Sequence, residues 1–212
     1  MKKYITYLFL IITTLLIYNK YQKCSTNKYT DLQKSISQKI IRFHVIGNSN
    51  TAYDQSLKLH IKNAIVQKIE PELNNVDNIT SARKIITQNL DLINHIAKRE
   101  LNKHNSSYSV KTTMSTRFFP IKQYGNMTLP EGEYESVCVE LGKAKGKNWW
   151  CVLYPSLCFI DCTYSVLPTD SQNKLNKVLS SDEYNYIITD KNTSVHYKSA
   201  IGIFLKKYFS FK

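Results

Sequence analysis

The sequence predicts a single α+β domain, in which an antiparallel-leaning or mixed sheet packs against two consecutive helices. Three observations lead to this fold class. A short strand-like run stands near residue 40, two long helical patterns follow over residues 52–103, and β-branched and aromatic runs then dominate up to residue 153. Helices and strands grouped in separate stretches are typical of α+β domains. The 212 residues, of which 42% are hydrophobic and 21% charged, suffice for one domain with its own core.

The N-terminal segment, residues 1–23, predicts an apolar export or anchor helix. Two lysines precede an uncharged, mostly apolar run at residues 4–18, which is the pattern of a secretory signal peptide. The run is shorter than the roughly 20 residues that a spanning helix needs. No clear cleavage site follows, so a cleaved signal peptide and an uncleaved signal anchor both stay open, beside a buried core helix. Residues 24–38 are polar and predict a linker, which leaves residues 39–212 as the predicted domain.

The first predicted strand, residues 40–46 (IIRFHVI), leads into a turn and a helix. The strand alternates in part, and the polar cluster at residues 47–50 predicts the turn. Residues 52–69 carry apolar side chains at helical spacing, and Pro71 is expected to end this helix. Asp54 lies in the first turn of the helix, where its carboxylate can cap free backbone N–H groups.

A second and longer helix is predicted at residues 79–103. Thr80 or Ser81 is a suitable residue to cap its start. The predicted buried stripe consists of apolar residues at helical spacing: Ala82, Ile86, Leu90, Ile93, Ala97 and Leu101.

Strands follow the helices. Residues 107–119 and 134–141 have the composition that packs on a pleated sheet. The basic turn at residues 142–148 leads to a strand at residues 149–153, which together predict a β-hairpin. Residues 194–208 predict a last helix, so the expected order is β-α-α-β-β-β-α.

The chain is basic, with 29 lysines and arginines against 16 acids and a formal net charge of +13. Positive proteins are attracted to nucleic acids, anionic membranes and acidic polymers. Here most basic residues are lysines scattered along the chain, whereas nucleic-acid-binding surfaces usually concentrate them. The distribution favours a solvated surface, and we expect no nucleic-acid partner.

A polar cluster follows the first strand and contains His44, Asn48, Ser49, Asp54 and Gln55. One interpretation is catalytic, with a serine nucleophile, a histidine base and an aspartate that orients it. The glycines that surround a nucleophilic serine in a hydrolase elbow are missing, which argues against this. A second interpretation is structural, in which the aspartate caps the helix and its neighbours make turns. The third is a partner-binding surface, which we adopt as the hypothesis.

A second group, Lys147, Asn148, Trp149 and Trp150, completes the predicted partner-binding surface. The preceding stretch, residues 142–148 (GKAKGKN), does not have the spacing of a phosphate-binding loop. An exposed basic turn is the better interpretation. The two tryptophans can alternate, one in the core and one outside, and an exposed tryptophan is a good binding anchor.

The chain has five cysteines, three of which stand within a short stretch at Cys151, Cys158 and Cys162. The last two have the spacing of half a zinc site, but no second pair is nearby, so we expect no metal. A disulfide between Cys151 and Cys158, closing the turn around Pro155, is the preferred hypothesis, because an exported chain can form disulfides.

Two segments stand out as unusual in residue choice. The first is residues 42–49 (RFHVIGNS), followed by Asp54-Gln55 and Leu57-Lys58 at the start of the predicted helix. The second is residues 146–161 (GKNWWCVLYPSLCFID). Both resemble the signature blocks of the stage II sporulation protein R family. The resemblance spans roughly residues 38–161 and is loose beyond. The chain departs from the family pattern at Tyr154-Pro155-Ser156, where Phe-Pro-Pro is frequent, and in its additional cysteines.

The resemblance implies a role in endospore formation. Members of this family are made in the forespore and exported to the space between two membranes. There they activate a membrane-embedded aspartic protease, which processes the precursor of sigma factor E. The resemblance implies that the chain is a signal rather than an enzyme and needs no cofactor, with membrane association possible through residues 4–18. The alternatives are an exported cell-wall or peptide hydrolase and a cell-surface binding module.

Overall fold

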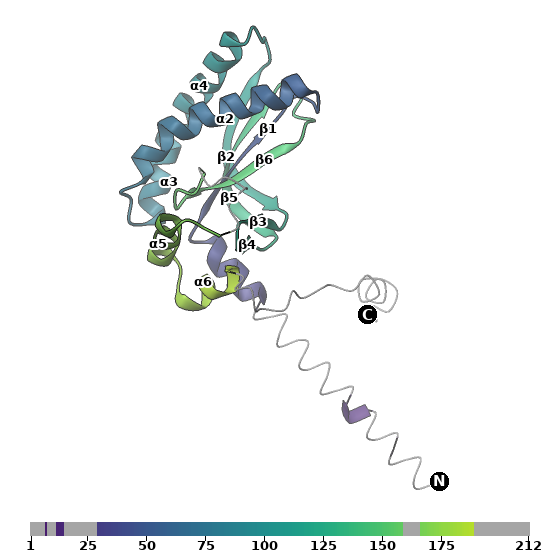
Figure 1. The fold of residues 1–212 in the computed structure, drawn as a ribbon, viewed down its shortest axis with the longest axis vertical. Helices are drawn as coiled ribbons and strands as arrows, with labels where there is room; N and C mark the ends of the chain where they lie inside the picture. Colours follow the sequence, from purple (N-terminus) through teal and green to yellow (C-terminus); the bar gives the residue numbers. More distant parts are fainter. Residues whose placement is uncertain (1–6, 8–11, 15–28, 159–165, 189–212) are drawn as a thin grey trace.

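A computed structural model of the chain describes residues 29–158 and 166–188, together with Tyr7 and residues 12–14. At its centre lies a four-stranded sheet in the order β2-β5-β1-β6 (Figure 1). β1 is parallel to β5 and antiparallel to β6, and β2 is antiparallel to β5, so this single α+β domain has a mixed sheet. The strands span Ile41–Ile46 (β1), Val110–Phe119 (β2), Gly132–Leu141 (β5) and Asn148–Tyr154 (β6).

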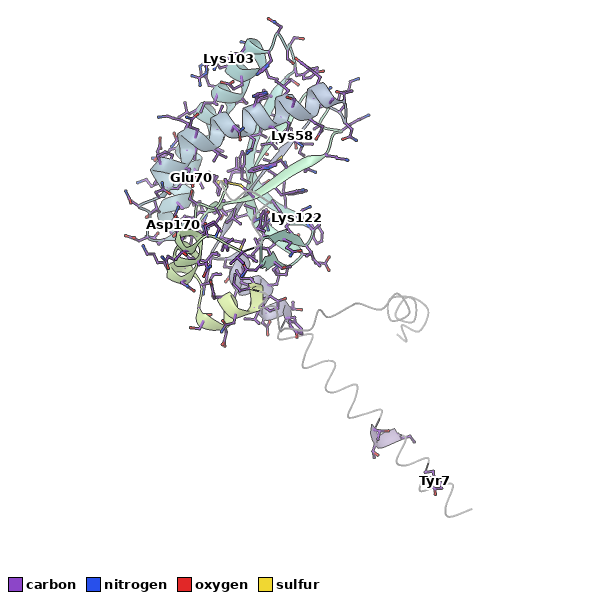
Figure 2. All side chains as sticks on the ribbon, in the orientation of Figure 1. Tyr7, Lys58, Glu70, Lys103, Lys122 and Asp170 are labelled. Carbon is purple, nitrogen blue, oxygen red and sulfur yellow. A yellow bond between two sulfur atoms is a disulfide. The ribbon has the colours of Figure 1, made fainter. Side chains whose placement is uncertain are left out.

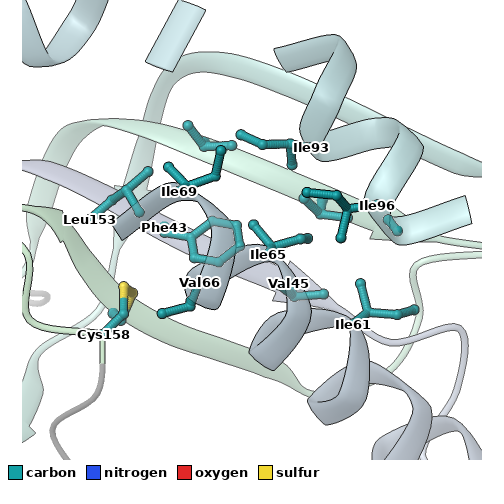
Figure 3. Close-up of a cluster of buried hydrophobic side chains, with 14 of the residues drawn as sticks. Phe43, Val45, Ile61, Ile65, Val66, Ile69, Ile93, Ile96, Leu153 and Cys158 are labelled. Atoms are coloured by element: carbon teal, nitrogen blue, oxygen red, sulfur yellow. A yellow bond between two sulfur atoms is a disulfide. The ribbon is translucent and has the colours of Figure 1, made fainter. Parts of the chain in front are cut away.

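Three helices cover one face of the sheet (Figure 1). They span Ala52–Leu73 (α2), Ile79–Gln88 (α3) and Leu90–Lys103 (α4). Phe43 and Val45 of β1 point toward the helices and pack with Ile61 and Ile65 of α2 (Figure 3). All four side chains are at most 1% exposed. Because burying one such side chain contributes about 1.5–3 kcal/mol, this cluster holds the helical layer on the sheet.

A second hydrophobic cluster covers part of the opposite face. Residues of the sheet that point away from the helices, such as Tyr134 and Val152, belong to it. It also takes side chains from β3 (Lys122–Tyr124), β4 (Met127–Leu129), α5 (Thr169–Val178) and α6 (Ser181–Ile187). The sequence patterns did not predict these four short elements.

Residues 29–37, which the sequence analysis assigned to a polar linker, form a helix. Its Ile36 is fully buried in the second cluster. Glu183 of α6 accepts hydrogen bonds from Ser35 at 2.5 Å and from Lys39 at 2.7 Å. These contacts attach the segment before β1 to the domain.

The predicted long helix at residues 79–103 is two helices. Asn89, with φ −98° and ψ 4°, ends α3 and begins α4. The apolar spacing continues across this residue, so periodicity alone could not reveal the break. The cap of α3 is Asn78, whose side-chain oxygen accepts from the N–H of Ser81 at 2.8 Å, rather than Thr80 or Ser81.

Pro71 does not end the preceding helix, which continues to Leu73. Proline lacks the N–H that would donate to the carbonyl of Gln67, so one hydrogen bond of the last turn is lost. Leu73 is only 2% exposed and packs in the core, which offsets this loss.

The predicted hairpin of residues 134–153 is wrong. β5 and β6 are not neighbours, because β1 lies between them and pairs with both. The loop at residues 142–147 therefore crosses the end of β1 instead of closing a tight turn. A loop of this length and polarity is compatible with either connection, and nothing local in the sequence distinguishes them.

Two predicted segments lie outside the described residues. They are the helix at residues 194–208 and, apart from Tyr7 and residues 12–14, the apolar run at residues 4–18. In the part of the chain that the structure describes, no helix combines the length and apolarity needed to cross a membrane.

Candidate functional site

Two loops cross at one end of the sheet and bring the two unusual sequence segments together. The loop at residues 142–147 leaves β5, passes the end of β1 and enters β6. Two of its backbone N–H groups donate to the carbonyl oxygens of Gly47 and Asn48, at 2.8 and 3.2 Å. We call residues 47–50 and 142–147 together the loop crossing.

Asparagine side chains extend this contact. The side-chain oxygen of Asn48 accepts from the backbone N–H of Lys143 at 3.0 Å. That of Asn50 accepts from the N–H of Lys147 at 2.7 Å. The crossing loop lies outside the sheet, so these two N–H groups have no strand to pair with. The asparagine side chains supply the acceptors instead.

Asp54 gathers the side chains of the turn. Its Oδ2 accepts hydrogen bonds from the Asn48 amide at 2.8 Å and from the Ser49 hydroxyl at 2.5 Å. Burial alone would raise the pKa of Asp54, but the hydrogen bonds led by Ser49 and Asn48 outweigh it and leave the pKa below its ordinary value. Asp54 was predicted to cap helix α2. The cap is instead Thr51, whose side chain accepts from the N–H of Asp54 at 3.2 Å.

The crossing loop approaches the turn so closely that two positions require glycine. A Cβ at Gly146 would lie 2.3 Å from the carbonyl oxygen of Ser49. Gly142 has φ +57°, and a Cβ there would lie 2.4 Å from Oδ1 of Asn48. These contacts give both glycines of the basic turn a structural reason.

Lys58 joins the turn, the helix and the crossing loop, although the sequence analysis did not place it in the predicted partner-binding surface. Its ammonium donates to the Gln55 side chain at 2.6 Å and to the carbonyl oxygen of Lys147 at 3.0 Å. Gln55 in turn donates to the carbonyl oxygen of Ser49 at 2.8 Å. Lys58 is only 5% exposed, and burial, followed by the charge of Lys147, lowers its pKa. The signal that could have identified Lys58 is its spacing of three from Gln55, one helical turn away.

His44 does not join this network. It lies on the face of the sheet that points away from the helices, where its ring stacks on Trp150 with centroids 4.9 Å apart and contacts Phe119 at 5.3 Å. Burial, aided by the charge of Arg117, lowers its pKa to about 4. Asn148 lies beside the ring but outside hydrogen-bonding geometry, and neither ring nitrogen has a partner among the described residues.

The two tryptophans alternate across β6, and each carries a lysine. Trp149 packs on the helical side, edge-on to Phe43, and the ammonium of Lys62 lies 4.5 Å from its ring centroid. Trp150 lies on the opposite side, with the ammonium of Lys122 at 5.4 Å. Both tryptophans are partly exposed. Cation–π pairs of this kind contribute about 0.5–1 kcal/mol at exposed sites.

Arg42 is a second residue to which the sequence analysis gave no role, although it begins the first segment that resembles the family. It is fully buried, and its guanidinium stands over the rings of Phe119 at 4.5 Å and Tyr134 at 5.2 Å. It donates to the hydroxyl of Tyr124 at 3.0 Å and to the carbonyl oxygen of Cys151 at 3.1 Å. Burial lowers its pKa. The arginine joins β6 to the β3–β4 lobe.

The structure joins Cys151 and Cys158 by a disulfide, with Cα atoms 5.3 Å apart. Cys138 is a free, buried thiol on β5, and burial raises its pKa to about 12. Within residues 29–158 and 166–188, no group of three or more histidine, cysteine or acidic side chains could hold a metal ion.

The catalytic interpretation requires a serine–histidine contact, and the described residues form none. The hydroxyl of Ser49 donates to Asp54, while the ring of His44 is enclosed by Trp150 and Phe119. The polar residues of the turn instead fix the shape of the loop crossing. A surface whose loops are already rigid loses less entropy when it binds a partner.

The region that contains this site also matches known proteins. The family model described as "Stage II sporulation protein R (spore_II_R)" matches residues 37–164, more than half of the chain. The chain is 34% identical over 174 residues to "Stage II sporulation protein R" of Bacillus subtilis (strain 168), which covers 79% of this chain and 75% of that protein. No solved structure matches the chain. From the family model and this relative we conclude that the chain belongs to the stage II sporulation protein R family.

Proposed function

We propose that the chain is an exported forespore signalling protein, which activates the membrane-embedded aspartic protease that processes the sigma factor E precursor. It acts by binding and uses no cofactor. A bound ligand shifts an enzyme between two states only through its different affinity for them. The protein would therefore bind the active arrangement of the protease more tightly than the inactive one.

Family membership is the observation that carries this proposal, because the match covers the loop crossing and all of β6. The partner-binding surface would comprise His44, Asn48, Ser49, Asp54 and Gln55, with Lys147, Asn148, Trp149 and Trp150. In the structure His44 and Asp54 are buried, so they would support this surface from beneath, and the other residues are at least partly exposed. The exposed residues include two parts. The turn and Lys147 form the rigid loop crossing, and Trp149 and Trp150 present partly exposed rings on the two sides of β6.

Export to the intermembrane space, with release or retention at the membrane, is part of the proposal. Its support is the sequence pattern of two lysines before the apolar run at residues 4–18. Once exported, the chain would face the outer portion of a protease embedded in the opposing membrane.

The test is cleavage of the sigma factor precursor in a sporulating strain that lacks this gene. We expect cleavage to stop and to return when a forespore-expressed, full-length copy is supplied. The matched control is the same copy without residues 1–23, which should fail to restore cleavage although the protein accumulates. Normal cleavage in the strain without the gene would overturn the proposal.

A further inference from the structure

One edge of β6 has the properties of a site for strand addition. We propose that the outer edge of β6 binds an extended, acidic segment of the partner protein as an additional β-strand. This rests on the proposed function and deepens it, since it names the part of the surface that is used and the chemistry of the segment that it recognises.

The backbone of β6 provides the first argument. β6 is the last strand of the sheet, so one of its edges faces away from β1 (Figure 1). Cys151 pairs with Phe43 of β1, and its carbonyl oxygen also accepts from the side-chain Nε of Arg42 at 3.1 Å. The carbonyl oxygen of Val152 points outward and accepts from the N–H of Leu157 at 3.2 Å.

Successive residues of a paired strand direct their backbone groups to opposite edges. Trp150 and Asn148, two and four residues before Val152, therefore also point their N–H and C=O groups outward. None of the hydrogen bonds among the described residues uses these outward groups. Such a row of donors and acceptors is a template for another extended backbone.

The side chains provide the second argument. Lys62 lies over Trp149 on one side of the strand, and Lys122 lies over Trp150 on the other. Figure 2 labels Lys122 on β3. The side chains of an added strand alternate between the two sides, so those on either side would meet an ammonium group and an aromatic ring.

The loop that enters β6 continues the positive charge. Lys143, Lys145 and Lys147 are all exposed on the crossing loop directly before the strand. Positive charge along the edge favours carboxylate side chains and disfavours basic ones. The outward row of N–H and C=O groups selects a polypeptide, because a nucleic acid has no backbone that pairs with it in this way.

Peptide binding to the full-length chain in detergent micelles tests the proposal. The probes are overlapping synthetic peptides that cover the segments of the protease exposed between the membranes. Trp149 and Trp150 are the only tryptophans of the chain, so intrinsic fluorescence reports directly on the edge. We expect the tryptophan fluorescence to change and then saturate as a peptide of net negative charge is added. N-methylation of alternate residues on its pairing edge should abolish binding, and N-methylation on the other edge should leave it intact.

Charge reversal supplies the matched variants. Lys62→Glu combined with Lys122→Glu should weaken the binding of that peptide about tenfold, or about 1.4 kcal/mol. Lys111→Glu reverses one lysine on β2, the other edge strand, and should leave the affinity unchanged, whereas Lys62→Glu and Lys122→Glu should each weaken binding when made singly. An equal loss with Lys111→Glu, or equal binding of both N-methylated peptides, would overturn the strand-addition proposal.

The intact protease separates this proposal from the proposed function. If the protease co-purifies with the chain but no acidic peptide binds, the strand-addition proposal is wrong and the proposed function stands. The lysines would then only protect the edge against unwanted pairing. If the intact protease does not bind either, the proposed function fails and takes the strand-addition proposal with it.

Discussion

The side-chain oxygen of Asn48 accepts a hydrogen bond from the backbone N–H of Lys143, which lies 95 residues further along the chain. The same side chain donates to Asp54, so one asparagine joins the turn after β1, the start of α2 and the crossing loop. The position of the Asn48 side chain therefore helps to determine the shape of the loop crossing.

Asn48→Ala should lower the free energy of unfolding by about 1–3 kcal/mol, because it removes one of the hydrogen bonds to the buried Asp54 and leaves the backbone N–H of Lys143 without its side-chain acceptor. Urea unfolding followed by circular dichroism measures this. The control is Asn102→Ala at the exposed end of α4, which should change stability by less than about 0.5 kcal/mol. Equal stability of the two variants would mean that the asparagine does not support the crossing.

Gly146→Ala should destabilise the protein by about 1–3 kcal/mol through overpacking, because the added methyl would stand 2.3 Å from the carbonyl oxygen of Ser49. Lys145→Ala, in the same loop and exposed, tests whether the effect is steric. We expect a thermal transition close to that of the natural chain for Lys145→Ala and a clearly lower one for Gly146→Ala. A pair of matching transitions would contradict the close approach of the two loops.

His44 should make stability depend on pH between about 6.5 and about 4, the values of its ordinary and its lowered pKa. Above this range the ring is neutral in both states. Within it the unfolded chain binds a proton that the folded chain does not, so stability falls as the pH falls, by about 3 kcal/mol in all. His44→Phe removes the titration and should flatten the curve in this interval.

The ring can also be observed directly. Its NMR signals in the natural chain should titrate near pH 4, provided that the chain is still folded there. Parallel stability curves for the natural chain and His44→Phe, or titration near 6.5, would show that the ring is not enclosed by Trp150 and Phe119.

The disulfide should stabilise the chain by constraining a short loop. Replacing Cys151 and Cys158 together by serine should lower the free energy of unfolding by about 2–3 kcal/mol, as expected for a loop of this size. Mass spectrometry of peptides from the non-reduced protein should show the pair linked. A reducing agent should lower the unfolding midpoint of the natural chain to that of the double variant and have no effect on the variant. Free thiols at both positions in the non-reduced protein would contradict the bond.

Local patterns predicted the elements that carry their own signal. The alternation of Phe43 and Val45 located β1, and the apolar spacing of Ile61 and Ile65 located α2. The two tryptophans alternate across β6 as predicted, but both are partly exposed, so the expected division into one core ring and one outer ring is not seen. Each of these depends only on residues within a few positions of one another.

What the sequence could not supply is the pairing of distant segments. The insertion of β1 between β5 and β6 depends on partners about a hundred residues apart, so local composition suggested a hairpin instead. The role of Arg42 was missed for the same reason, because the groups that it contacts are distant in sequence. Lys58 has one local partner, Gln55, but its contact with the crossing loop is also distant in sequence. The break at Asn89 was missed because the helical period continues through it.

The position of β1 also constrains the order in which the chain can acquire its fold. The strand nearest the N-terminus is an inner strand of the sheet, and its two neighbours end only at Leu141 and Tyr154. A chain that emerges N-terminus first, from a ribosome or through a membrane pore, can form local helices early but cannot complete this sheet until residue 154 has appeared. Sheets built from such distant pairs form slowly. The topology thus keeps the nascent domain open over most of its length, which is the state in which a narrow translocation channel accepts a polypeptide.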